Sequence, residues 1–278
     1  MIKKYLKYCL LFSVAFTQAE FQICTIPKNA YMLSTKNGFS AFKAELTQNN
    51  RLNMDIIYFP SKINYVNMQY QNYSLSILDY GKIIDQIDDN IINSFKSYEL
   101  SFKYHYQKQL RGQLIINMNG GILYSQISNY NSSALISNFK FYLNNKSNFS
   151  ISFNNIGFII DSYTSTDQKM PIQLQLGILK NIKKTNIAFG YDIIYHTNIK
   201  KYEHILCMQI PIIDTILFRI SSSNFRDELL TGDLGQDWFY GFGYGLSIRS
   251  EKIHSDIGLS SLGDSGFAYG FSIKYYMN

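Results

Sequence analysis

The sequence predicts an all-β protein, a transmembrane antiparallel β-barrel of about 14 strands. Three observations support this fold class. Apolar and polar residues alternate with period two along most of the chain. Aromatic residues make up 16% of the 278 residues, whereas charged residues make up only 17%. After the leader, no apolar run reaches the roughly 18 residues that a membrane-spanning helix needs.

The first 19 residues have the features of a cleavable signal peptide. Three lysines precede a short apolar stretch at 8–16, and small residues lead up to Ala19. We expect cleavage after Ala19, with residues 20–278 forming one exported barrel domain. An N-terminal helix of the fold is the alternative. Loss of the three leader lysines lowers the net charge from +6 to about +3, so the composition gives no support for a nucleic-acid partner.

The clearest strand lies at 98–106. Side chains of a strand point alternately to opposite faces, so this segment has one apolar and one polar face. The apolar face consists of Tyr98, Leu100, Phe102, Tyr104 and Tyr106. The polar face consists of Glu99, Ser101, Lys103 and His105.

The same alternation recurs from the start of the mature chain to its end. It predicts strands at 36–46, 62–71, 73–80, 98–106, 112–126, 133–143, 147–153, 171–180, 187–196, 202–210, 213–221, 238–249, 251–260 and 267–277. Most are close to the roughly 9–11 residues that cross a bilayer at a tilt. Two longer connections, 81–96 and 154–170, are interpreted as surface loops or a short helix.

The polar face distinguishes a membrane barrel from a secreted soluble sandwich. A sandwich exposes its polar face to water and would carry many Lys, Glu and Thr there. Here the polar face is rich in Gly, Ser, Gln and Asn, while the other face is aromatic. We therefore expect the apolar face to meet outer-membrane lipid, although base composition of the genome could also raise the aromatic count.

On the barrel interpretation, isolated charges of the polar face point into the lumen. The candidates are Glu99, Lys103, His105, Asp192, His196, Arg219, Arg249, His254, Asp256 and Lys274. They could pair with one another and fill the interior, or they could line a path for a ligand. No motif indicates catalysis, a metal or a cofactor, so we expect a non-enzymatic protein. Gly241 to Gly245 lie inside a strand pattern, and His254 with Asp256 lacks a nucleophile placed nearby.

Several short motifs follow one another in order. Gly38-Phe39-Ser40-Ala41 stands near the mature start, and Tyr80-Gly81 ends an alternating run. Asn154-Asn155-Ile156-Gly157 precedes Met170-Pro171 and a Leu-rich strand, and 241–248 and 266–275 close the chain. This series resembles the PorV/PorQ family of FadL-like outer-membrane proteins, which are associated with type IX secretion. The family's Asn-Pro-Ala element is reduced to Pro60, and the terminal Phe of many barrels is absent.

The resemblance implies a FadL-like barrel of 14 strands whose N-terminus enters or lines the lumen. It also implies a role in type IX secretion or in attachment of surface proteins, with secretion-system proteins or secreted cargo as partners. The alternative that it leaves open is a FadL-like channel for uptake of hydrophobic small molecules. It carries over no catalytic residue.

Overall fold

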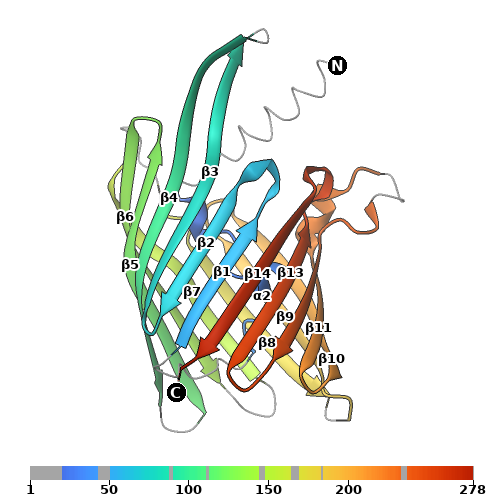
Figure 1. The fold of residues 1–278 in the computed structure, drawn as a ribbon. Helices are drawn as coiled ribbons and strands as arrows, with labels where there is room; N and C mark the ends of the chain where they lie inside the picture. Colours follow the sequence, from blue (N-terminus) through green and yellow to red (C-terminus); the bar gives the residue numbers. More distant parts are fainter. Residues whose placement is uncertain are drawn as a thin grey trace.

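The computed structural model describes residues 21–42, 51–87, 90–110, 113–143, 148–163, 169–182, 184–232 and 237–277. The predicted signal peptide lies outside these residues. Fourteen strands form a closed antiparallel barrel in which sequence neighbours pair and β1 also pairs with β14 (Figure 1). The predicted all-β barrel of about 14 strands is therefore confirmed. No helix of the described residues is long and apolar enough to cross a membrane.

The strands take up most of the described chain. They are β1 Arg51–Tyr58, β2 Asn64–Tyr70, β3 Tyr73–Ile87, β4 Asn90–Gln109, β5 Leu114–Ile127, β6 Tyr130–Leu143, β7 Asn148–Asp161, β8 Gln173–Ile182, β9 Ile187–His196, β10 Lys201–Ile213, β11 Ile216–Ser223, β12 Phe242–Arg249, β13 Ile253–Ser261 and β14 Phe267–Tyr276. Short 3-10 turns η2 Pro60–Lys62, η3 Asn224–Leu229 and η4 Gly263–Ser265 lie in connections at one end of the barrel.

The period-two pattern has a direct structural cause. Phe102 and Tyr104 of β4 are exposed on the outside, whereas Glu99 and Ser101 are buried inside. The same division holds around the barrel, and the exposed apolar side chains include Leu75, Ile122, Phe149, Leu176, Leu206, Ile257 and Phe271. A continuous apolar exterior of this kind matches hydrocarbon rather than water.

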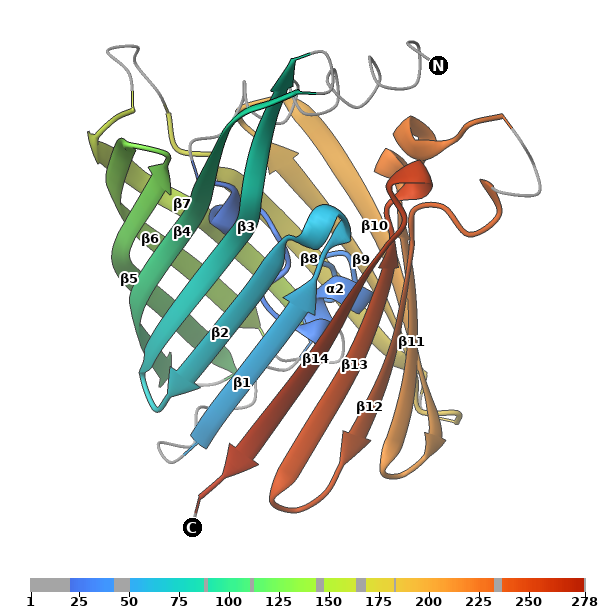
Figure 2. The same cartoon turned by 45° about the horizontal axis from the view of Figure 1, so that its top comes forward.

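The N-terminal segment, residues 21–42, lies inside the barrel. It contains the 3-10 turn η1 Gln22–Cys24 and the short helix α2 Ala30–Ser34. Asn29 caps α2 by accepting a hydrogen bond from the Met32 amide at 2.8 Å. Figure 2 shows α2 within the ring of strands, with η1 nearer the wall formed by β3–β5. The N-terminus implied by the family resemblance is thus in the lumen.

The predicted strand at 36–46 is wrong over its described part. Residues 36–42 form turns, and Lys36, Asn37 and Phe39 all have φ between 54° and 62°, which an extended strand cannot contain. The first strand is β1 instead. Its polar face is interrupted by Ile57, which packs against apolar residues of the lumen, so the run Ile56-Ile57-Tyr58-Phe59 hides the alternation.

Both long connections were also misjudged. Residues 81–87 and 90–96 extend β3 and β4 into a hairpin that projects beyond its neighbours (Figure 1). Residues 154–161 belong to β7, with a register shift opposite β6 between Ser137 and Phe139. The connections of the barrel end where β1 begins and β14 ends are two to four residues long. We call this the turn end and the opposite end the loop end, where connections include 162–172 and 224–241.

Candidate functional site

The lumen is crossed by the N-terminal segment, and three charged side chains of the wall are prominent among the groups that hold it. The first is Glu99 of β4, which is 3% exposed. Its carboxylate accepts hydrogen bonds from the backbone amides of Gln22 at 3.1 Å and Ile23 at 2.7 Å, and from the Tyr80 hydroxyl at 2.7 Å. A carboxylate that accepts three bonds is strongly held even where water is excluded. Glu99 therefore fixes η1 to the wall.

The second anchor is Arg219 of β11, which is 1% exposed. Its Nη2 lies 2.7 Å from Asp256 Oδ1, and its Nη1 donates to Ser247. On the other side, its Nε donates to Ser34 Oγ at 3.3 Å and its guanidinium lies 4.5 Å from the centre of the Tyr31 ring. The same cation therefore joins the wall to α2.

The third anchor is Asp192 of β9, which is fully buried. It accepts a bond from the Ser40 amide at 3.2 Å, from the Ser40 hydroxyl, and from Gln175 Nε2 at 3.0 Å. Gln175 also donates to the Asn37 carbonyl at 2.9 Å. These bonds satisfy backbone groups of a segment that has little regular structure of its own.

Small residues in the wall let the segment approach closely. A Cβ at Gly243 of β12 would lie 2.6 Å from the Ser34 carbonyl oxygen, and one at Gly245 would lie 2.5 Å from Ser34 Oγ. No side chain fits at such distances. The inward glycines that the sequence shows in this strand therefore make room for α2.

The two ends of the lumen differ in chemistry. Toward the loop end, Phe21 and Ile23 pack into an apolar cluster with residues near the end of β1 and the start of β2, among them Ile57 and Tyr65. Toward the turn end lies a cavity of about 510 Å³. Arg51 near the start of β1, Arg249 at the end of β12 and Lys274 near the end of β14 help to line it.

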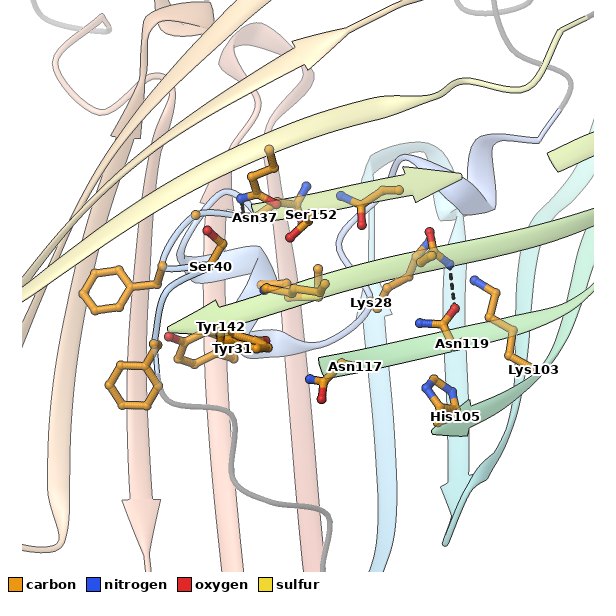
Figure 3. A pocket seen from close by; sticks show the side chains of 18 of the residues that line it. Lys28, Tyr31, Asn37, Ser40, Lys103, His105, Asn117, Asn119, Tyr142 and Ser152 are labelled. Carbon is orange, nitrogen blue, oxygen red and sulfur yellow. Dashed lines mark hydrogen bonds between the residues drawn. The ribbon is translucent and has the colours of Figure 1, made fainter. Parts of the chain in front are cut away.

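The cavity is strongly cationic. Among the described residues that line it are six lysines and arginines, two histidines and a single acidic residue, Asp256, which is already paired with Arg219. The lysines and arginines are Lys28, Arg51, Lys103, Lys140, Arg249 and Lys274. Neutral polar groups such as Asn117, Asn119 and Ser152 lie between them (Figure 3).

One side of the cavity brings two lysines together. Lys28 comes from the N-terminal segment and Lys103 from β4, and both point toward Asn119 in Figure 3. Burial, together with the charge of Lys103, lowers the pKa of Lys28 to about 7. Asn119 accepts a bond from Asn138 Nδ2 at 2.6 Å, which leaves its amide hydrogens for another acceptor. His105 lies beside this group and contacts Ser74 at 2.7 Å.

The ten charged candidates from the sequence fall into three groups. Glu99, Asp192 and Arg219 are buried against the N-terminal segment. His196 lies at the end of β9, 3.0 Å from Glu203. The remaining six line the cavity: Lys103, His105, Arg249, His254, Asp256 and Lys274. Sequence reasoning missed Lys28 and Arg51, because both lie in stretches where no correct strand was predicted.

Two cysteines remain in the described chain, and both are buried with free thiols. Cys24 belongs to η1 and Cys207 to β10. Burial raises the pKa of the Cys24 thiol to about 11, so this thiol is protonated near neutral pH. Within the described ranges, no group of three His, Cys, Asp or Glu residues could hold a metal ion.

Comparison with known proteins supports the fold. No protein-family model matches the sequence, and no curated protein matches it. The CymD monoaromatic hydrocarbon channel has a TM-score of 0.51 at 10% identity, over 91% of this chain and 94% of that chain. Omp33 of Acinetobacter baumannii has a TM-score of 0.47 at 11% identity, over 84% and 100% of the two chains. At 10% identity, the likeness to CymD shows a shared β-barrel fold and nothing finer.

Proposed function

We propose that this protein is an outer-membrane channel for small solutes whose N-terminal segment blocks the lumen. The observation that carries the proposal is the way the segment is held. Residues 21–42 cross the interior of a closed barrel and are fixed by side chains of the wall, not by pairing into the sheet. A plug of this kind can move without breaking the barrel.

The apolar exterior supports insertion into a membrane, and the predicted signal peptide supports export. Outer-membrane barrels have short turns on the periplasmic side and longer loops outside. By that rule the turn end faces the periplasm, so the cationic cavity lies on the periplasmic side of the plug. N-terminal sequencing of the mature protein should begin at Glu20 if the leader is cleaved as predicted.

The secretion role implied by the PorV/PorQ resemblance stays a prediction. Deleting the gene should abolish display of surface proteins if that role is correct. A hydrophobic solute, the other alternative, is less well supported by this lumen. Its apolar region is filled by Phe21 and Ile23, and its open region is lined by cations.

The channel can be tested by locking the plug to the wall. A Cβ at Gly38 would lie 2.8 Å from Cys207 Sγ, close to the distance of about 3 Å that separates a Cβ from the partner sulfur in a disulfide. The same Cβ would lie 2.8 Å from Ile205 Cγ2 and 2.9 Å from the Thr35 carbonyl oxygen, so the loosely structured segment must shift slightly to accept it. We expect Gly38→Cys to form a reversible cross-link between the segment and β10. In planar bilayers the oxidised variant should stay closed, and a reductant should restore the openings of the native protein.

A variant that lacks residues 21–42 provides the complementary measurement. It should show a conductance several times that of the native chain, because the segment that crosses the lumen is gone. Heat-modifiable migration on a gel should confirm that this shortened chain still forms a barrel. A folded deletion variant with no conductance would contradict the proposed channel.

A further inference from the structure

The cationic cavity contains a buried ammonium group without a hydrogen-bond partner. The Lys28 Nζ atom is shielded from solvent and makes no hydrogen bond with the described residues. Its nearest aromatic contact is the Tyr65 ring, 5.8 Å from Nζ to the ring centre. Burial of an unpaired charge is strongly unfavourable, so such a group favours a bound counter-ion.

The surrounding groups sharpen that requirement. The charge of Lys103 acts on Lys28 and opposes its protonation. The negative charge of Glu99 favours the protonated form of Lys28. The Glu99 oxygens, however, accept hydrogen bonds from Gln22, Ile23 and Tyr80, and Glu99 forms no ion pair with either lysine. Two neighbouring ammonium groups, the free amide hydrogens of Asn119 and the imidazole of His105 all favour oxygen atoms that carry negative charge.

We propose that the cavity binds a small oxyanion with more than one negative charge, a phosphate or a polycarboxylate, between Lys28 and Lys103. This proposal rests on the channel function proposed above and names the class of solute. A plain hydrocarbon offers nothing to these donors. A multiply charged oxyanion can bind both lysines at once and can accept a bond from Asn119.

The site joins two parts that the channel function requires to separate. Lys28 belongs to the plug and Lys103 to the wall, so a bound anion bridges the two and holds the plug in place. Cys24 is four residues before Lys28 and lines the same cavity. Because its thiol is buried, alkylation of Cys24 reports release of this part of the plug. A bound anion should therefore slow the alkylation.

Calorimetry on the full folded barrel in detergent tests the site directly. Inorganic phosphate and citrate serve as the two probes, and the one that binds more tightly identifies the source of the oxyanion. Lys28→Met and Lys103→Met should each weaken binding about tenfold or more, since each removes one charge-assisted bond, and a tenfold change is about 1.4 kcal/mol. Lys252→Met is the control, because Lys252 is exposed in the turn between β12 and β13.

The outcomes separate the two proposals. Binding that both cavity variants weaken, with the control unchanged, supports the anion site. No binding of either probe, or binding that both variants leave intact, overturns it, while the conductance of the locked and shortened chains still decides the channel. Binding without any conductance would keep the site and reject the channel.

Discussion

Arg219 and Lys103 are both inward-facing cations on barrel strands, yet the lumen treats them in opposite ways. Arg219 is paired with Asp256 and also contacts Ser34 of the plug. Lys103 lines an open cavity and forms no ion pair with a described carboxylate. Both side chains are cationic and both point inward, so neither property distinguishes them. The ion pairs and hydrogen bonds that each cation makes decide whether it holds the plug or is available to a solute.

Breaking the ion pair between Arg219 and Asp256 should have the largest effect on the stability of the barrel. Asp256→Asn leaves the Arg219 guanidinium buried without its carboxylate, and loss of one partner of a buried ion pair typically costs about 3–5 kcal/mol. We expect a marked fall in the temperature at which the barrel loses its heat-modifiable migration on a gel. The double variant Arg219→Met with Asp256→Leu should recover part of the loss, because no unpaired charge remains. An unchanged melting temperature for Asp256→Asn would contradict the anchoring role.

The second largest effect is expected when Glu99, which holds η1 to the wall, loses its charge. Glu99→Gln keeps the shape of the side chain but removes the charge that accepts from Gln22, Ile23 and Tyr80. Weakened bonds to a buried group cost about 1–3 kcal/mol. The rate of Cys24 alkylation in the folded barrel should therefore rise about tenfold or more. Glu203→Gln serves as the control, since Glu203 of β10 contacts His196 of β9 and makes no hydrogen bond to η1 among the described residues.

The sequence predicted the sheet far better than the plug. Alternation places Phe102 outside and Glu99 inside wherever a strand is long and regular, because side-chain direction follows directly from the strand geometry. The segment around Gly38 and Phe39 carries a similar alternation but folds into turns, since its conformation depends on contacts with distant strands. Asp192 could be predicted as inward-facing, but no local pattern shows that it accepts a bond from Ser40.

The same limit applies to the cavity. Lys103 and His105 were candidates because they lie on the polar face of a clear strand. Lys28 was not, because its place beside Lys103 arises from the path of the plug across the lumen. A list of inward charges from the sequence therefore mixes anchors with cavity residues, and the contacts of each residue are needed to separate them.

The pH dependence of anion binding sharpens the cationic side of the comparison. Burial and the Lys103 charge lower the pKa of Lys28 to about 7, so the ammonium form is dominant at pH 6 and scarce at pH 8. Sulfate keeps its charge over this range, and its affinity should fall about tenfold from pH 6 to pH 8, as the protonated fraction of one group with this pKa does. The groups that face Lys28 are Lys103, His105, Glu99, Cys24 and Tyr65.

Two variants isolate the lysine in that measurement. Lys28→Met should remove most of the pH dependence. His105→Gln should preserve it, since the charge that changes over this range belongs to Lys28 of the plug and not to the wall. A dependence that His105→Gln abolishes and Lys28→Met retains would move the pH-sensitive contact from the plug to the wall.

The smallest effect on stability is expected when the unpaired cation, Lys103, is replaced. Lys103→Met keeps the alkyl stem and removes an unpaired charge from the lumen, so the free energy of unfolding should change by less than about 1 kcal/mol, or increase. The same gel assay that reports Asp256→Asn would measure it, with anion left out of the buffer. A loss as large as that of Asp256→Asn would mean that Lys103 has a structural partner, and the distinction between a cation that anchors the plug and one that is available to a solute would fail.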